Sequence, residues 1–312
     1  MKNLKLLNNL ILCFGLLAFT QFGLTTSIYA QSPQLKKRVA VFAFKDETDN
    51  GGGWGRYKTV GEGLADMLTT ELVQSGQYRM IEREELESLL QEQDLGAQGV
   101  VTPESAASMG QVLGVELAVV GSVTEFGYKD RGGDGAVKSV GLGYRNEAAV
   151  VAVDVRLINT STGEIIAAEQ VRKSKSAKGV KLRTRDFNVD NRRGFDESLV
   201  GKAARQAVER VATLVNENVS KVSWKAKVIT TNSGSVYINA GSTDGIKAGD
   251  HFFIYKEGEA LIDPDTGLNL GAVEKKVGKI KVVSADVGEG KASQCQIVEG
   301  SNFQKGDIVK ID

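Results

Sequence analysis

An unbroken apolar run near the start of the chain, Val39–Phe44, sets the strongest constraint on the fold. A strand without polar alternation has no face suited to water, so both of its faces must be covered. The stretch Val115–Val120 is similar, with Glu116 as its one charged residue, and we expect a second buried strand there. The two runs therefore predict two strands that are covered on both faces.

Helix-forming segments lie between these runs. Apolar residues repeat at helical spacing over 60–72, and Gly76 follows as a stop signal. A short strand is expected at 78–81 and a second helix at 84–93. A third helix is expected to open at Pro103, because proline suits the first turn of a helix.

The segment 148–158 alternates between apolar and other residues, as expected for a strand with one buried face. The polar sequence at 159–163 predicts a turn, and 164–171 predicts the returning strand. The apolar residues on the predicted inner face are Val151, Val153, Val155 and Leu157.

A long helix is expected to close this part of the chain, with Asp196 as its N-cap. Its predicted inward residues are Leu199, Ala203, Ala207, Val211, Leu214 and Val215. We expect this domain to span residues 31–222.

The pattern of residues changes from Trp224 onward, where short β-prone runs alternate with turns. The turns include Ser233–Gly234, Asp244–Gly245, Glu257–Gly258, Gly288–Gly290 and Lys305–Gly306. Regular spacing of this kind indicates a small all-β barrel or sandwich. We expect a separate β-domain over 223–312, in the form of an SH3-like barrel.

Residues 1–30 have the pattern of a cleaved secretory signal peptide. Lys2 and Lys5 give a basic start, and the apolar core that follows is too short to span a bilayer. The alternative is an N-terminal anchor helix. Cys13 lies inside the apolar core, without the small preceding residue that lipidation needs, so we expect an exported, unlipidated protein.

The charge balance gives no reason to expect a nucleic-acid partner. Without residues 1–30 the chain has 37 basic and 39 acidic side chains. Cys295 is then the only cysteine, which leaves no intramolecular disulfide and no cysteine-based zinc site. The only histidine, His251, is assigned a structural role, and Cys295 has no motif around it. Because no local signature of a nucleophile is present, we expect no catalytic residue, no metal and no cofactor.

Two glycine-containing segments resemble ligand sites only in part. The loop Gly51–Gly55 lies between a predicted strand and a helix, as phosphate loops do, but it lacks their Lys-Ser/Thr pair. We interpret it as a loop that presents Trp54 and Tyr57 to a partner, or that folds one aromatic ring back on the domain. The segment Asp263–Gly267 has its glycine one place too early for a calcium loop and predicts a hairpin turn.

Two further segments have the pattern of a strand between lipid and a polar lumen. Glycine is too frequent over 126–145 for a packed helix, and one strand face of this segment is mostly apolar. Over 180–185, apolar residues and threonine alternate with Lys181, Arg183 and Arg185. A strand with one apolar and one basic face suits the wall of a transmembrane channel. The alternative is a pair of long, solvated hairpins.

Several motifs, in this order along the chain, resemble those of the CsgG family of curli-secretion channels. They are Arg38–Phe44 with Asp46–Thr48, Ile81–Leu86 with Leu89–Leu90, Val119–Val123 and, most specifically, Val153–Ile165. This resemblance covers roughly residues 38–220. The segment 225–312 is similar to the C-terminal β-domain of the flagellar protein FlgT, which suggests an envelope interaction module.

The resemblance implies a periplasmic α/β (α+β) domain that assembles into a homo-oligomeric ring. Each subunit sends two β-hairpins, here near 127–150 and 172–197, into the outer membrane, where unfolded curli-type subunits pass through the barrel. The constriction of that channel comes from the loop after the first strand. The resemblance therefore assigns contacts with the exported chain to Asn50, Trp54 and Tyr57, and makes Lys181, Arg183 and Arg185 candidate pore-lining residues.

Two departures from the family leave a second interpretation open. The family's secretion channels carry a lipidated N-terminal cysteine, which this sequence does not, and the second hairpin segment is rich in lysine and arginine. A basic side chain on the lipid face near mid-bilayer costs roughly 2–4 kcal/mol. The alternative is a soluble periplasmic scaffold with the same fold that binds envelope proteins through its β-domain. Neither interpretation is an enzyme.

Overall fold

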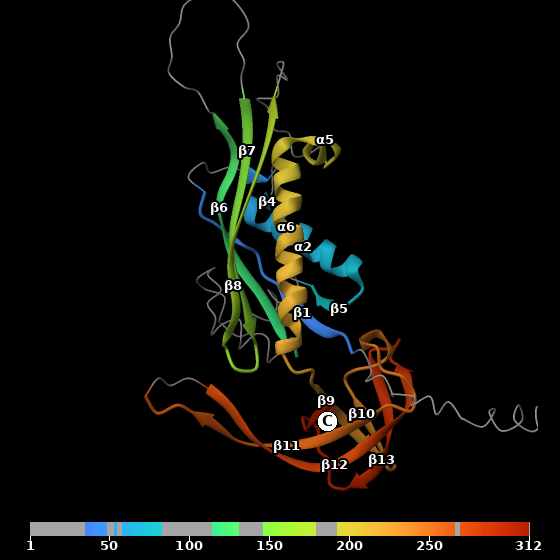
Figure 1. Cartoon of the computed structure of the whole chain (residues 1–312). Helices are drawn as coiled ribbons and strands as arrows, with labels where there is room; N and C mark the ends of the chain where they lie inside the picture. The colour runs from blue at the N-terminus through green and yellow to red at the C-terminus, as the bar shows by residue number, and fades with distance from the viewer. Residues whose placement is uncertain are drawn as a thin grey trace, which may run out of the picture. The chain divides into compact units, whose positions relative to one another are not determined.

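The computed structural model describes residues 35–48, 53–54, 58–82, 114–130, 146–178, 192–265 and 269–311, all within the unit Leu35–Asp312. A six-stranded mixed sheet with helices is followed by a closed six-stranded barrel (Figure 1). The predicted α+β class with a C-terminal barrel is therefore confirmed. The SH3-like class and the boundaries near residues 30 and 222 stay predictions. The expected leader and the expected helices at 84–93 and from Pro103 lie outside the described residues.

The mixed sheet has the strand order β5-β1-β6-β7-β8. β1 (Lys37–Val41) pairs in parallel with β5 (Tyr78–Ile81) on one side and with β6 (Leu117–Asp130) on the other. β7 (Asn146–Asn159) and β8 (Ile165–Lys178) continue the sheet as an antiparallel meander.

The first strand is shorter than the apolar run predicted. β1 ends at Val41, and the chain passes through Phe42–Phe44 to β2 (Lys45–Asp46), which pairs in parallel with β6. The connecting residues stay extended, since the Phe42 N–H donates to the Val119 carbonyl at 3.0 Å. The strand is therefore interrupted, but the backbone keeps following β6.

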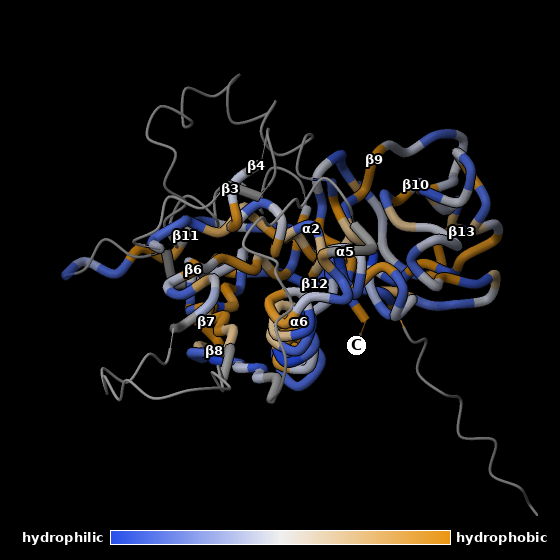
Figure 2. The backbone as a smooth tube through the Cα atoms, turned by 90° about the horizontal axis from the view of Figure 1, so that it is seen from above, coloured by the Kyte–Doolittle hydropathy of each residue, from blue (hydrophilic) through white to orange (hydrophobic). Residues whose placement is uncertain are grey.

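Alternate residues of β1 and β6 are buried on opposite faces, which explains their unbroken apolar sequence. Val39 and Leu117 belong to the main core, on the face covered by helices. Ala40 and Ala118 belong to a smaller core on the other face. Helices α2 (Val60–Ser75) and α6 (Leu199–Asn218) pack on the main core. The hydrophilic residues of α6 lie on its side away from the sheet (Figure 2).

The predicted start and stop of α2 are confirmed by its caps. Thr59 Oγ1 accepts a hydrogen bond from the Glu62 N–H at 3.2 Å, and the Glu62 carboxylate accepts one from the Thr59 N–H at 2.7 Å. This reciprocal pair satisfies two amide groups at the helix start. At the other end, Gly76 has a left-handed backbone (φ +66°), which glycine adopts without steric cost.

The expected N-cap of the last helix is wrong. Asp196 lies inside a short helix, α5 (Arg192–Glu197), where its carboxylate pairs with Arg205 at 2.5 Å. The cap of α6 is Ser198, whose Oγ accepts a hydrogen bond from the Gly201 N–H at 2.9 Å. Five of the predicted inward residues of α6 are buried, and the sixth, Leu199, packs partly buried against the same core. The buried five are Ala203, Ala207, Val211, Leu214 and Val215.

The C-terminal barrel closes in the order β10-β13-β12-β11-β14-β9, and β9 pairs back with β10. Its strands are β9 (Ala226–Asn232), β10 (Ser235–Ile238), β11 (His251–Ile262), β12 (Asn269–Val287), β13 (Ala292–Gly300) and β14 (Ile308–Lys310). Two 3₁₀ turns, η1 (Val219–Lys221) and η2 (Ser242–Asp244), precede and interrupt it.

The barrel has a core of its own. Trp224 stacks on Phe252 with ring centroids 5.3 Å apart. Cys295 is fully buried in this core, and burial raises the pKa of its thiol to about 12. Burial in apolar surroundings makes such a thiol unreactive. His251, by contrast, is exposed at the start of β11.

Residue Gly61 allows α2 to begin directly against the strand connection. A Cβ atom at this position would lie 1.8 Å from the Phe44 carbonyl oxygen. We therefore expect Gly61→Ala to lower the free energy of unfolding by about 1–3 kcal/mol. This is the net loss, after the gain of roughly 1 kcal/mol that alanine gives over glycine in an open helix. Urea unfolding measures the change.

Thr70→Ala is the matched control for Gly61→Ala, because Thr70 is exposed on the same helix. It should leave the urea midpoint nearly unchanged. Equal midpoints for the two variants would show that α2 does not rest on Phe44.

Candidate functional site

The structure describes only one of the predicted constriction residues, and only in its backbone. Trp54 lies in β3 (Gly53–Trp54), which pairs antiparallel with β4 (Lys58–Thr59). The segment was expected to be a loop without strands, so this short sheet is a correction. Asn50 and Tyr57 lie outside the described residues, as do the pore-lining candidates Lys181, Arg183 and Arg185.

The segment that holds Trp54 is anchored at both ends. Before it, β2 pairs with β6, and the Glu47 N–H donates to the Val123 carbonyl at 2.9 Å. After it, Thr59 caps α2. Backbone pairing and a helix cap therefore attach both ends of the segment to the sheet layer.

The strands β6, β7 and β8 each have 14 residues, longer than the other strands of the mixed sheet. β6 and β7 pair out to Asp130 and Glu147, and β7 and β8 pair out to Asn146 and Lys178. The end of β6, the start of β7 and the end of β8 lie at the same end of the sheet (Figure 1). The segments 131–145 and 179–191 therefore both leave the sheet there.

This geometry bears on the two predicted hairpins. The ladder includes the flanks of the first, near 127–150, and its tip lies outside the described residues. For the second, near 172–197, the flank up to Lys178 is a strand, but Arg192–Glu197 forms helix α5. A hairpin after β8 must therefore end before residue 192, because those residues are helical.

The far part of β8 is basic and partly exposed. Beyond the buried Val171, the side chains of Arg172, Lys173 and Lys175 are exposed or half-buried. Arg172 forms a two-pronged ion pair with Glu125 on β6, at 2.8 and 3.2 Å. Since both partners are largely exposed, this pair contributes little to stability.

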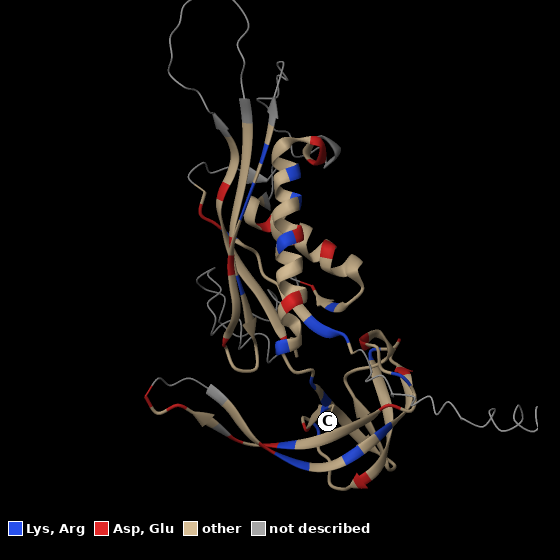
Figure 3. Ribbon diagram, in the orientation of Figure 1, with Lys and Arg blue, Asp and Glu red and all other residues tan. Residues whose placement is uncertain are grey.

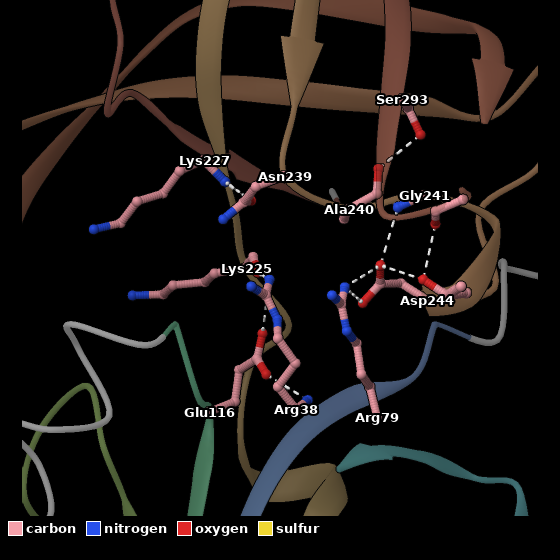
Figure 4. Close-up of polar contacts among 12 residues, drawn as sticks. Arg38, Arg79, Glu116, Lys225, Lys227, Asn239, Ala240, Gly241, Asp244 and Ser293 are labelled. Atoms are coloured by element: carbon pink, nitrogen blue, oxygen red, sulfur yellow. Dashed lines mark hydrogen bonds and ion pairs between the residues drawn. The ribbon is translucent and has the colours of Figure 1, made fainter. Parts of the chain in front are cut away.

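A cluster of buried charges links the other end of the sheet to Lys225, the residue before β9, and to η2 (Figure 4). The Arg38 N–H donates to Glu116 Oε2 at 2.6 Å, and the Arg38 guanidinium lies 3.6 Å from Glu116 Oε1. The guanidinium also donates to the Lys225 carbonyl at 2.8 Å. The two side chains are only 5% and 4% exposed. Burial raises the pKa of Glu116 to about 7, although the Arg38 charge lowers it.

A second ion pair lies beside the first. Arg79 on β5 contacts both carboxylate oxygens of Asp244, at 2.8 and 2.9 Å (Figure 4). The Asp244 side chain has no exposed surface and also accepts a hydrogen bond from the Gly241 N–H at 3.0 Å. A buried carboxylate of this kind is stable only when it is paired, so Arg79 ties the sheet to η2 of the barrel.

Sequence reasoning missed this charge cluster. Arg38 and Arg79 looked like ordinary strand residues, and Asp244 looked only like part of a turn. The one available signal was Glu116, a lone carboxylate inside an apolar run. The charged side chains of the cluster pair with one another and with backbone groups.

The described residues also bear on metal sites and on membrane-spanning helices. Among those residues, no three His, Cys, Asp or Glu side chains come close enough to hold a metal ion. None of the helices there combines the length and hydrophobicity needed to cross a membrane.

The pKa of Glu116 predicts a pH-dependent stability. Its folded-state pKa, about 7, lies above the ordinary value of 4.5, so the folded protein holds this proton more tightly. Stability should therefore fall as pH rises between about 4.5 and 7. Glu116→Gln removes this titration, and the two stability–pH profiles should diverge by on the order of 1–3 kcal/mol across that window. Urea unfolding at pH 5, 6, 7 and 8 measures both; parallel profiles would contradict the assignment.

Three comparisons with known proteins bear on identity. No curated protein matches the sequence. Several solved structures are distantly similar to this chain. One is the hypothetical protein CT253 from Chlamydia trachomatis, with 16% sequence identity and a TM-score of 0.40. The match covers 60% of this chain and 99% of CT253. Lipoprotein GNA1162 from Neisseria meningitidis has 14% identity and a TM-score of 0.33, covering 59% and 99%. The C-terminal domain of LpoB from Salmonella enterica has 16% identity and a TM-score of 0.31, covering 44% and 82%. At these scores the likenesses carry no argument.

The comparison with family models is decisive. Residues 21–248 match the model described as curli production assembly/transport component CsgG. The likeness of 225–312 to the FlgT β-domain stays a prediction. Family membership points to an envelope-associated function. Because this match covers most of the chain, the protein belongs to the CsgG family.

Proposed function

We propose that this protein is an assembly or secretion component of the Gram-negative envelope, and not an enzyme. Its copies form a ring in the periplasm whose hairpins open a channel in the outer membrane for unfolded protein subunits. One observation carries the proposal. The three 14-residue strands β6, β7 and β8 send the segments 131–145 and 179–191 out of the same end of the sheet.

Free strand edges support a ring rather than a single copy. β8 is the edge strand of the sheet, and β6 beyond Val123 pairs only with β7 among the described residues. Strands that enter a membrane must have every backbone group hydrogen-bonded, which requires closure into a cylinder. One copy offers too few strands for this, so the edge of β8 in one copy would pair with that of β6 in the next.

The constriction of such a channel belongs to the segment that holds Trp54. It leaves the sheet beside β6 and returns to it at the cap of α2. A segment held at both ends can keep a fixed aperture against a passing chain. In this proposal Asn50, Trp54 and Tyr57 contact the exported chain, and the C-terminal barrel binds another envelope protein.

A second function is favoured by the charges of β8. Arg172, Lys173 and Lys175 follow one another in the part of the strand nearest the predicted membrane hairpin. On a lipid face such residues cost roughly 2–4 kcal/mol each near the bilayer centre. A soluble periplasmic scaffold with the same fold avoids that cost.

Fractionation separates the two functions. The channel proposal predicts that the processed chain stays with the outer membrane after osmotic shock and high salt. Detergent should then release it as a large symmetric oligomer. Release by osmotic shock alone as a monomer or small oligomer would overturn the channel and favour the scaffold.

Planar-bilayer recordings test the constriction. Replacing both aromatic residues, by Trp54→Ala with Tyr57→Ala, should raise the single-channel conductance, because the narrowest section becomes wider. The control His251→Ala, on an exposed barrel strand, should leave the conductance unchanged. An unchanged conductance in the double variant, with intact channels, would remove both aromatic residues from the constriction.

A further inference from the structure

The hairpin β11–β12 extends well beyond the barrel (Figure 1). β11 pairs with β14 only at Phe253–Tyr255, and β12 pairs with β13 only from Gly278 onward. Residues 257–265 and 269–274, which we call the arm, form strand pairs only with each other among the described residues, as at Ala260 and Ala272. Its strands reach roughly 20 Å at about 3.4 Å per residue.

The arm combines exposed apolar side chains with negative charge. Leu261, Ile262 and Val273 are 48%, 53% and 58% exposed. Leu261 and Val273 share one face, since each directly follows a member of the Ala260–Ala272 pair. Residues 257–274 include five acidic residues and no lysine or arginine. Glu257 and Glu259 are exposed and form no ion pair with another described residue.

An uncovered two-stranded hairpin is only marginally stable in water. The base of the arm is held by Glu274, which pairs with Lys225 at 3.6 Å and with Lys310. Farther along the arm, no other described residue covers the exposed apolar side chains of Leu261, Ile262 and Val273. Exposed apolar side chains on an extended strand pair are typical of a surface that binds another protein.

The same two strands carry a surface of opposite character where they form the barrel wall. Ile280 and Val282 point into the core, so Lys279, Lys281 and Val283 point outward. Lys276 Nζ lies 3.2 Å above the ring centroid of Phe253, and Lys279 Nζ lies 5.4 Å from it.

We call this surface the lysine face, and it consists of Phe253, Lys276, Lys279, Lys281 and Val283. Figure 3 shows the basic stretch and the acidic arm along the same hairpin. Val283 is 54% exposed. Glu299 lies opposite Lys279 on β13, so three lysines outnumber this neighbouring acid.

We propose that the arm of one copy docks on the lysine face of a second copy. The two surfaces match in kind, because each combines charges of one sign with apolar side chains, and the signs are opposite. They cannot meet within one molecule, because the arm continues the strands that carry the lysine face and points away from it. Every copy carries both surfaces and cannot join them within itself. The contact therefore forms between two copies.

Such a contact is head-to-tail, and it closes into a ring when the rotation between copies allows. The inference rests on the proposed ring and adds a specific interface to it. In that interface Glu259, on the same face of the arm as Leu261 and Val273, faces Lys279 and Lys281, and Glu257 adds negative charge from the opposite face. The apolar residues Leu261 and Val273 cover Phe253 and Val283.

Charge reversal in the full chain tests the interface. The arm variant is Glu257→Lys with Glu259→Lys, and the face variant is Lys279→Glu with Lys281→Glu. Each variant alone should self-associate at least about tenfold more weakly in sedimentation velocity, because like charges then face each other. An equimolar mixture of the two should assemble like the wild type, since every arm again meets a face of opposite sign.

Two further variants control for charge and for apolar contact. Lys247→Glu with Lys305→Glu makes the same charge change at exposed positions outside both surfaces and should assemble normally. Leu261→Ser with Val273→Ser should weaken assembly in a way that added salt does not reproduce. The mixture also controls for folding, because misfolded variants would not restore each other.

The outcomes separate this inference from the proposed function. If both reversal variants assemble like the wild type, or if their mixture does not recover, the arm–face contact is wrong, and a channel can still form through other surfaces. If the contact passes the test while the protein shows no membrane association, the channel is wrong and the contact stands. A wild-type chain that is monomeric in every condition overturns both.

Discussion

The ladder formed by β6, β7 and β8 is the constraint on which the rest of the sheet depends. It runs from Leu117 opposite Asn159 to Asp130 opposite Glu147, with one register shift between Val123 and Glu125. Side chains alternate along a strand, so a register slip of one residue would turn Val151 and its neighbours away from α6. The buried face therefore specifies the register. The register in turn sets the common end from which the two undescribed segments leave.

Buried charge, rather than apolar packing alone, joins the sheet to the barrel. Arg38 with Glu116 and Arg79 with Asp244 are pairs with little or no exposed surface on their carboxylates. Within the described residues, Arg38 Nε and Glu116 Oε1 have no hydrogen-bond partner, so the first pair is incompletely satisfied. Ion pairs of this kind add little net stability but penalise any arrangement that separates the partners. They make the junction specific, and they make it sensitive to protonation of Glu116.

Unpaired strand edges connect the proposed channel with the proposed interface. Among the described residues, β8 is the edge strand of the mixed sheet, and the arm continues beyond the pairing with β13 and β14. Monomeric proteins usually block such edges, because they recruit other strands. Two separate sets of edges in one chain, one beside a basic strand and one beside an acidic hairpin, fit a protein that works as an assembly of copies.

Local pattern alone determined several elements: the extent of α2 with its stop at Gly76, the strand β5, the inner face of β7 and the β character after Trp224. These depend on periodicity and turn chemistry within a few residues. Tertiary structure decided the rest. β6 and β8 extend past their predicted ends at Val120 and Val171 because cross-strand partners supply hydrogen bonds to residues such as Lys173 that have no apolar pattern. The pairing of Arg79 with Asp244, 165 residues apart in sequence, and the length of the arm arise only when distant segments meet. A sequence read in short windows contains no signal for either.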